Sequence, residues 1–320
     1  MSGNTLKVGC LQIGSHPEGK QATLDVILSY ESAIQNSGVQ LLVLPEATLG
    51  GYPKGETFGT YLGYRLPEGR EQFRLYHANA IDVPEGPEVK ALEEFARRAK
   101  CFIVIGVIER AAEAPSTLYC TALYIDPEEG YCGKHRKLMP TATERLIWGQ
   151  GDGSTLEVLS PASLHHTKVA AAICWENYMP LLRMSYYAKG VQVYCAPTVD
   201  EREMWRHTMQ HIAAEGRCFV ASAVQIQGTP DDLHLPPEAV PGWARDRRLI
   251  NGGSVIVDPL GTIVAGPLVG EEGLISAEID LNEVVKGKYD FDVAGHYGRG
   301  DIFQLTVDER QKSVVKRITD

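Results

Sequence analysis

Three short segments of the chain carry side chains that could do chemistry together. An apolar run at 41–45 ends in Glu46, a second at 168–173 ends in Cys174, and a basic run ends in Lys137. A carboxylate can take the proton of a thiol, the thiolate is a nucleophile, and an ammonium stabilises negative charge that develops on a substrate. These residue types predict nucleophilic catalysis by a cysteine, provided that the fold brings them together.

The position of Glu46 favours a role as a general base. Residues 41–45 have the composition of a buried strand, and in open α/β sheets ligands bind at the carboxyl ends of the strands. A carboxylate against an apolar wall has its charged form disfavoured, which raises its pKa toward the range that suits a base. A helix-capping or turn glutamate is the alternative that this segment leaves open.

Cys174 lies where a strand-like segment passes into a helical pattern. Residues 168–173 include a small, apolar run, and Met179 and Pro180 open the helical pattern. A cysteine at such a turn projects from the sheet edge, and the backbone N–H groups after it lower the pKa of the thiol and can receive negative charge. The alternative is a buried cysteine in front of a core tryptophan, Trp175.

The basic run Lys134–Lys137 is less informative by itself. Four basic side chains in a row usually form a solvated face, and this is the expectation for the run considered alone. Its setting suggests more, because it follows the strand-like segment 121–125 and returns through Pro140. Glu144, seven residues beyond Lys137, could hold the ammonium in place.

The elements that must position these residues alternate along the chain. Apolar, β-branched runs predict strands, and apolar residues at helical spacing between them predict helices. The predicted strands are 7–13, 41–45, 102–109, 118–125, 168–174, 191–197 and 218–225, and the predicted helices are 22–35, 88–99, 180–189 and 204–216. This alternation predicts a layered α/β fold.

After Asn251 the predicted strands follow one another closely. They are 254–258, 262–265 and 274–279, and turn dipeptides join them, so we expect an antiparallel portion of the same sheets. The Pro-rich stretch 228–246 has no periodicity and is expected to be a surface loop. We therefore predict a single domain over 1–320, with this loop and a short C-terminal tail.

Composition and charge argue against several classes of partner. The chain has 320 residues, 44% of them apolar, and a net charge of −10, which disfavours binding to nucleic acid or to an anionic membrane. No secretory signal is visible, and the apolar runs are shorter than the ~18 residues of a spanning helix. Seven cysteines without a CxxC pair suggest a reducing, cytoplasmic setting. His207 and His211 have metal-pair spacing but lack an HExxH glutamate, so neither metal nor cofactor is expected.

Three blocks of sequence resemble the nitrilase family of carbon-nitrogen hydrolases. They are LLVLPEATLGGYPKG, KHRKLMPTATERLIWGQGDG and AAAICWENYMPLLR, and the resemblance extends over nearly the whole chain, from VGCLQI to GHYGRGD. It implies a four-layer α-β-β-α sandwich. It also implies that Glu46 is the general base and acid, Lys137 the stabilising cation and Cys174 the nucleophile. Glu144 matches an additional glutamate beside this triad.

Within the superfamily, the sequence is similar to the true nitrilase branch. CWENYMPLLR and the segment Asp292–Asp301 carry this similarity, although Gly300 stands where plant-type members usually have proline. The similarity implies hydrolysis of an organic nitrile to the carboxylic acid and ammonia through a cysteine thioimidate. Cyanide hydration or dihydration, and amide hydrolysis by an aliphatic amidase, are the alternatives within the superfamily.

The resemblance also bears on assembly and on the substrate pocket. Family members pair through helices near the cysteine, here 179–189, so we expect a homodimer or a higher homo-oligomer, while the short tail argues against long spirals. Tyr52, Trp148 and Trp175 lie beside the triad segments and are candidates for the wall of a nitrile pocket, with ordinary core aromatics as the alternative. Two rivals lie outside this scheme: a papain-like Cys–His hydrolase and a non-catalytic assembly module.

Overall fold

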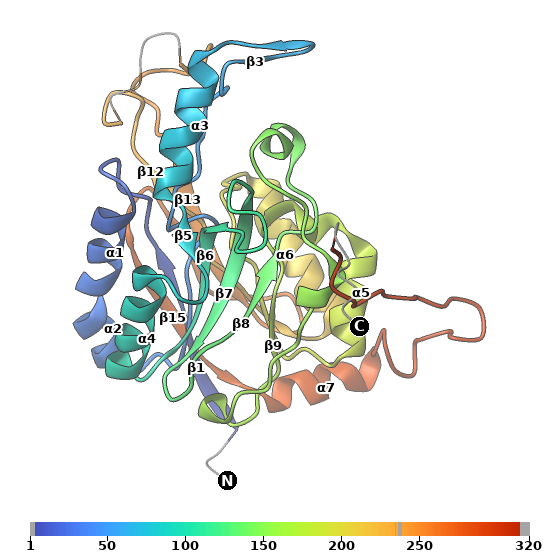
Figure 1. Ribbon diagram of the computed structural model, residues 1–320. Coiled ribbons are helices and arrows are strands. Elements are labelled where there is room, and N and C mark those ends of the chain that lie inside the picture. The colour runs from blue at the N-terminus through green and yellow to red at the C-terminus, as the bar shows by residue number, and fades with distance from the viewer. Residues whose placement is uncertain (1–3, 234, 236–238, 314–320) are drawn as a thin grey trace, which may run out of the picture.

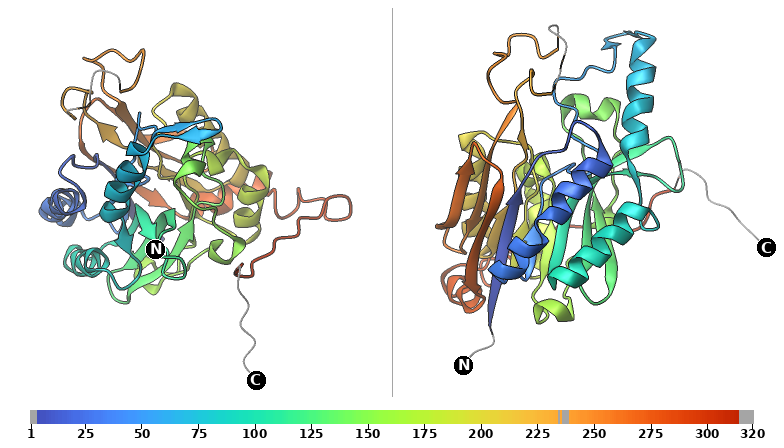
Figure 2. Two further views of the ribbon diagram at one scale, coloured as in Figure 1. Left: turned by 45° about the horizontal axis from the view of Figure 1, so that its top comes forward. Right: turned by 90° about the vertical axis from the view of Figure 1, so that its left-hand side faces the viewer.

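Two β-sheets packed face to face form the centre of the protein, and helices cover both outer faces (Figures 1 and 2). The structure is a computed structural model that describes residues 4–233, 235 and 239–313. The layers follow the order α-β-β-α, as the resemblance implied. Because the central strands have another sheet on one face and helices on the other, they read as continuous apolar runs without alternation.

The first sheet contains strands from the first half of the chain and one from its end. Their order is β15-β1-β2-β6-β7-β8, with β5 beside β6, and β1, β2 and β6 are parallel. The strands are β1 Thr5–Gln12, β2 Leu41–Val43, β5 Ile81–Asp82, β6 Phe102–Arg110, β7 Leu118–Asp126, β8 Gly130–Arg136 and β15 Gly273–Asp280. The helices on its outer face are α1 Lys20–Ser29, α2 Glu31–Ser37 and α4 Pro87–Ala99.

The second sheet has the order β12-β13-β11-β10-β9, with β14 beside β13. Its strands are β9 Val169–Ala171, β10 Val193–Cys195, β11 Phe219–Ser222, β12 Ile226–Gln227, β13 Ile250–Val257 and β14 Ile263–Val269. The helices α5 Pro180–Ala188 and α6 Glu203–Gly216 cover its outer face. The closely spaced strands after Asn251 do add antiparallel pairs, β13 to β11 and β15 to β1.

The core is divided by the first sheet. On β2, the side chains of Leu41 and Val43 pack between the two sheets, whereas Leu42 packs against the helices on the outer face. Because successive side chains of a strand point to opposite faces, both faces of β2 carry apolar side chains. A three-residue strand is thereby anchored on both sides, and the residues that follow it are held rigidly at the sheet edge.

Some elements depart from the sequence-based expectation. The predicted helix 22–35 is two helices, because the N–H of Tyr30 bonds to the carbonyl of Ile27 and closes α1 with a tight turn. The predicted strand 168–174 already ends at Ala171. Of the Pro-rich loop 228–246, residues 234 and 236–238 lie outside the described residues.

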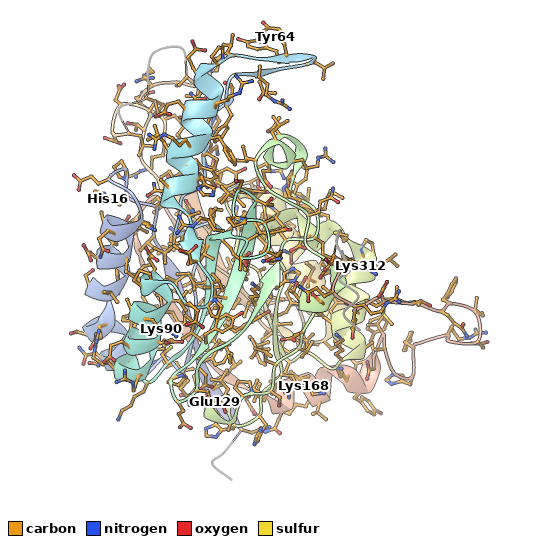
Figure 3. The ribbon with its side chains drawn as sticks, in the orientation of Figure 1. His16, Tyr64, Lys90, Glu129, Lys168 and Lys312 are labelled. Carbon is orange, nitrogen blue, oxygen red and sulfur yellow. The ribbon has the colours of Figure 1, made fainter. Side chains whose placement is uncertain are left out.

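A helix and a hairpin that the sequence pattern did not predict project beyond the sheets. They are α3 Glu68–Asn79 and the pair β3 Thr60–Tyr61 and β4 Tyr64–Arg65, whose place Tyr64 marks in Figure 3. Gly69 of α3 is buried and Phe73 and Tyr76 are half-buried against the core, so the apolar stripe of this helix is short. A further helix, α7 Asn282–Asp290, follows β15. Within the described residues, no helix combines the length and the apolar character needed to cross a bilayer.

Candidate active site

The backbone at Glu46 is held from both sheets. The N–H of Gly106 on β6 donates to the carbonyl of Pro45 at 3.1 Å. A Cβ at Gly106 would lie 2.5 Å from the Cα of Glu46, so this close approach requires glycine. From the segment between β11 and β12 of the second sheet, the side-chain amide of Gln225 donates to the carbonyl of Glu46 at 2.6 Å. The carboxylate is therefore fixed between the sheets, where it is fully buried.

The basic run lies along β8 and continues one residue beyond it, and its side chains alternate between the two faces of the strand. Lys134 and Arg136 both donate to Glu109 at 2.6 Å. His135 and Lys137 lie on the other face, between the sheets, and each contacts a buried carboxylate. The expectation that the four basic side chains form a solvated face is therefore wrong. Successive side chains of a strand point to opposite faces, so His135 and Lys137 are buried between the sheets.

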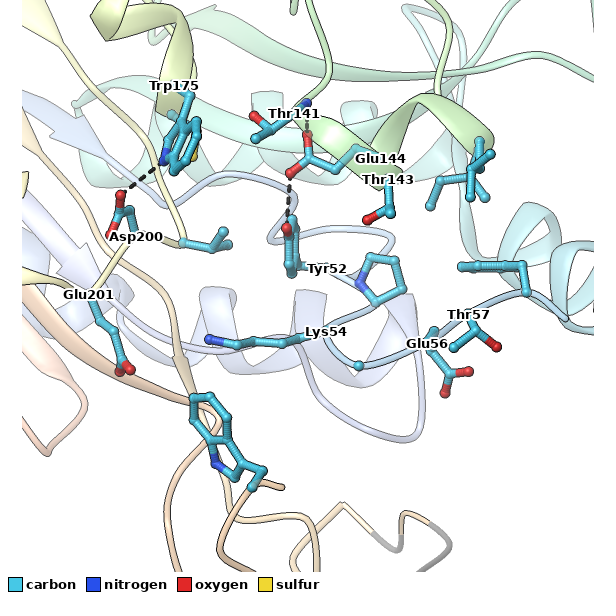
Figure 4. Close-up of a pocket in the computed structure, with 18 of the residues that line it drawn as sticks. Tyr52, Lys54, Glu56, Thr57, Thr141, Thr143, Glu144, Trp175, Asp200 and Glu201 are labelled. Carbon is cyan, nitrogen blue, oxygen red and sulfur yellow. Dashed lines mark hydrogen bonds between the residues drawn. The ribbon is translucent and has the colours of Figure 1, made fainter. Parts of the chain in front are cut away.

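Lys137 lies between two carboxylates. Its Nζ donates to Oε1 of Glu46 at 2.6 Å and to Oε2 of Glu144 at 2.8 Å. Glu144 belongs to the 3-10 helix η1 (Ala142–Leu146), and its carboxylate also accepts the backbone N–H of Thr141 at 2.6 Å and the hydroxyl of Tyr52 at 2.9 Å (Figure 4). These contacts fix the ammonium and the second carboxylate in one arrangement.

Cys174 occupies a sharp turn after β9. Its φ is 52°, in the left-handed region that residues other than glycine rarely adopt, and its N–H donates to the carbonyl of Pro197 at 2.9 Å. The 3-10 helix η4 (Cys174–Tyr178) and then α5 follow directly. The thiol is buried, and the charges of Glu46 and Lys137 both act on it. The structure thus brings together the three side chains that the sequence singled out.

Burial and charge set the protonation of these groups. Burial lowers the pKa of Lys137, but the negative charges of Glu46 and other neighbours outweigh burial. The pKa of Lys137 is therefore well above its ordinary value. Burial raises the pKa of Glu46, which Lys137 opposes. Burial, followed by the charge of Glu46, raises the pKa of the Cys174 thiol. The site therefore holds an ammonium and a protonated thiol beside a carboxylate that is more basic than usual and can take the thiol proton.

A cavity of about 710 Å³ gives access to these groups (Figure 4). Cys174 and Glu144 line it, together with two of the predicted wall residues, Tyr52 and Trp175. The cavity thus places the thiol at its surface while Glu46 and Lys137 stay buried behind it.

Trp148, the third aromatic residue proposed for the wall, lies behind Tyr52. It is 3% exposed, its ring centroid lies 5.8 Å from that of Tyr52, and its indole N–H donates to the hydroxyl of Tyr76 at 3.0 Å. An isolated backbone bridge to Leu118 holds Trp148 against β7. Its ring contacts the buried side of the site, because the Nζ of Lys137 lies 5.5 Å from its centroid.

The outer part of the cavity consists of residues that the sequence analysis did not single out. Asp200 accepts the indole N–H of Trp175 at 3.0 Å, and the guanidinium of Arg202 lies 5.0 Å from the centre of the same indole. The Nζ of Lys54 lies 5.1 Å from the ring of Trp243, which belongs to the Pro-rich loop. That loop therefore forms part of the wall. Only Asp200 had a usable signal, because it follows β10, the parallel neighbour of β9, at the same sheet edge.

The remaining candidate groups lie apart from the cavity. His207 and His211 are exposed on α6, 3.9 Å and 3.7 Å from glutamates of the same helix. No group of three or more His, Cys, Asp or Glu side chains in the described residues is arranged to hold a metal ion. The six cysteines other than Cys174 are free thiols outside the cavity lining, and all of them except Cys132 are buried.

Comparison with known proteins gives consistent matches. Residues 7–289 match the family model described as carbon-nitrogen hydrolase. The chain is 52% identical over 318 residues to an arylacetonitrilase of Trametes versicolor (96% of this chain, 98% of the relative), and 50% identical over 299 residues to a bifunctional nitrilase/nitrile hydratase of Nicotiana tabacum (92% and 83%). The crystal structure of Saccharomyces cerevisiae Nit3, a nitrilase-superfamily member, superimposes with a TM-score of 0.72 at 21% identity, covering 92% of this chain and 97% of Nit3.

Proposed function

We propose a reaction from the premise that this chain belongs to the nitrilase family of carbon-nitrogen hydrolases. The reaction is the hydrolysis of an organic nitrile to the carboxylic acid and ammonia. The observation that carries this proposal is the ammonium of Lys137 between the carboxylates of Glu46 and Glu144, beside the thiol of Cys174 at the surface of a cavity. The names of the matched relatives, which specify nitriles, favour a nitrile over an amide as the substrate.

The first half of the proposed reaction forms a covalent thioimidate. Glu46 takes the proton of Cys174, the sulfur adds to the nitrile carbon, and the proton passes from Glu46 to the nitrile nitrogen. Lys137 stabilises the negative charge that develops on the nitrogen. The backbone N–H of Trp175, which has no acceptor among the described residues, is a second donor for this charge.

The second half releases both products. Glu46 takes a proton from a water molecule, which adds to the thioimidate carbon to give a tetrahedral intermediate. Loss of ammonia leaves a thioester, and a second water then frees the acid and restores the thiol. If the carbon–sulfur bond of the tetrahedral intermediate breaks first, the product is the amide, so the product ratio depends on which leaving group is protonated.

The size and lining of the cavity support an organic nitrile over cyanide. A volume of about 710 Å³ lies within the usual range for small-molecule pockets and far exceeds what a diatomic anion needs. Tyr52, Trp175 and Trp243 supply aromatic surface for an apolar substituent. We therefore place the nitrile carbon next to Cys174 and its substituent toward Trp243.

Product analysis on a nitrile panel tests the proposal. Wild type, Cys174→Ala and, as a matched control, Cys132→Ala are incubated with aromatic, arylaceto- and aliphatic nitriles, with cyanide and with the matching amides. Ammonia, acid and amide are then measured. We expect wild type and the control to convert organic nitriles and Cys174→Ala to convert none. Turnover of amides or of cyanide alone would contradict the proposed substrate class, and activity in Cys174→Ala would contradict the nucleophile.

We also propose that this single-domain enzyme works as a homodimer or higher oligomer in the cytoplasm. Leu181 on α5 and Met204 on α6 are 67% and 60% exposed, and both lie on the face away from the sheets, where a second copy would cover them. Free cysteines suit a reducing compartment. Sedimentation of wild type and Leu181→Glu should show an oligomer and a smaller species respectively, and identical masses would contradict this interface.

A further inference from the structure

One buried carboxylate contacts both halves of the proposed active site. Glu176 accepts the backbone N–H of Leu138 at 2.6 Å and that of Ile173 at 2.8 Å. Leu138 directly follows Lys137, and Ile173 directly precedes Cys174. A single side chain therefore links the peptide that carries the ammonium to the peptide that carries the thiol, although the two are far apart in the sequence.

His135 is the third partner of this carboxylate. Its Nε2 lies 2.9 Å from Oε2 of Glu176, and its Nδ1 lies 3.2 Å from the backbone carbonyl oxygen of Thr155. The shortest contact of each ring nitrogen is to an acceptor oxygen, which is the arrangement that an imidazolium satisfies. Burial lowers the pKa of His135, but the negative charge of Glu176 raises it above its ordinary value. Tyr186 from α5 packs edge-on against it, with centroids 6.5 Å apart, and its hydroxyl donates elsewhere, to the carbonyl of Ala171.

We propose that Glu176 and His135 form a buried imidazolium–carboxylate pair that positions Lys137 relative to Cys174. The inference rests on the proposed function, in which the ammonium and the thiol act on the same substrate atoms. Neither Glu176 nor His135 is among the residues that line the cavity, so they act through the backbone and not by touching the substrate.

The pair suits this role because it is complete. Both side chains are fully buried, and the carboxylate is satisfied by two backbone donors and one imidazolium. A buried charge that loses its partners is strongly destabilising. The pair therefore favours the one arrangement in which the segments that carry Lys137 and Cys174 both keep their contacts with Glu176. Removing it leaves the N–H groups of Leu138 and Ile173 without their acceptor. A shift of about 1 Å between reacting groups lowers the rate about 10²-fold.

Four variants test the proposal: Glu176→Gln, His135→Gln, the double variant, and Glu109→Gln as a matched control. Glu109 binds the cations on the opposite face of the same strand, β8, away from Cys174. Three quantities are measured: kcat and KM on a nitrile, the melting temperature, and the pH dependence of the alkylation of Cys174 by iodoacetamide, followed by mass spectrometry. Alkylation needs no substrate and reports directly on the thiol and its neighbours.

We expect Glu176→Gln to lower kcat about 10²-fold with KM within about twofold, and to move the alkylation profile to higher pH. His135→Gln, which keeps a donor but loses the charge, should lower kcat less, and the double variant should be no worse than Glu176→Gln because the pair acts as a unit. Glu109→Gln should affect only melting. If the site variants lose melting temperature but keep the wild-type kcat and alkylation profile, the inference is wrong. If wild type converts no nitrile yet alkylation still slows in Glu176→Gln, the proposed function fails and the positioning role stands.

Discussion

Replacing Lys137 by methionine tests whether the ammonium is what allows two carboxylates to share a buried site. The side chains of Lys137 and Glu46 are fully buried, and that of Glu144 is 9% exposed. Methionine is similar in length and uncharged, so the variant leaves the two carboxylates facing each other without a cation. Removing one partner of a buried ion pair costs about 3–5 kcal/mol. At about 2 °C per kcal/mol for a chain of this size, the melting temperature should fall by roughly 6–10 °C near neutral pH.

The size of this loss depends on pH in a definite direction. In wild type, burial raises the pKa of Glu46 and Lys137 lowers it, so the variant loses the lowering contribution and the pKa in the folded state rises further above its unfolded value. A carboxyl whose pKa is raised by folding favours the folded state below its unfolded pKa, and this contribution is lost as the pH rises through the folded pKa. The difference in melting temperature between wild type and Lys137→Met should therefore be largest above neutral pH and should shrink as the pH falls.

Thermal unfolding of wild type and Lys137→Met from acidic to mildly alkaline pH measures the fall in melting temperature and its dependence on pH. Lys134→Met is the matched control, because Lys134 belongs to the same basic run and its partner Glu109 keeps a second cation, Arg136. The control should melt within about 2 °C of wild type. If Lys137→Met has the wild-type melting temperature near neutral pH, or if the difference between the two melting temperatures stays constant as the pH falls, the ammonium is not what stabilises the two carboxylates.

Three further substitutions have expected outcomes. Gly106→Ala introduces a Cβ 2.5 Å from the Cα of Glu46, so kcat should fall at least ~10²-fold and the melting temperature should fall too, whereas unchanged kinetics would contradict the close approach. Tyr52→Phe removes the hydroxyl bound to Glu144, and kcat/KM should fall roughly tenfold with little change in melting. Lys137→Arg keeps the charge but is planar and larger, so kcat should fall ~10²–10³-fold, and near-normal turnover would show that the compact ammonium is not needed.

The layered fold was predictable from local sequence, because buried strands and amphipathic helices carry period and composition that can be read directly. The strand before Glu46 and the turn at Cys174 were recognised for the same reason: each ends an apolar run. Their meeting could not be derived from either segment, since it depends on contacts between the two sheets, such as that of Gln225 with the carbonyl of Glu46. The resemblance to a known family was what indicated that Glu46 and Cys174 belong to one site.

The cavity wall was less predictable, because its residues come from loops that have no periodicity. Trp243 lies in the Pro-rich loop and Lys54 in the turn that follows Tyr52, and nothing in their local sequence indicates that they lie next to each other. Trp148, which lies beside the lysine segment in sequence, packs behind Tyr52 and is not among the residues that line the cavity. The helix α3 was not predicted because only Gly69 in it is fully buried and only Phe73 and Tyr76 pack against the core, which makes a short apolar stripe.

The charges of the site explain how the proposed reaction can run in a buried place. Lys137 carries one positive charge, and Glu46 and Glu144 together carry two negative charges, part of which is balanced by the donors Tyr52 and Thr141. When Glu46 takes the thiol proton, negative charge moves to the sulfur and the total is unchanged, so no charge has to be brought into the low-dielectric interior. Glu144 has its own hydrogen bond from the ammonium and holds it in place while Glu46 is protonated. Two carboxylates around one lysine therefore suit a step in which one of them must become neutral.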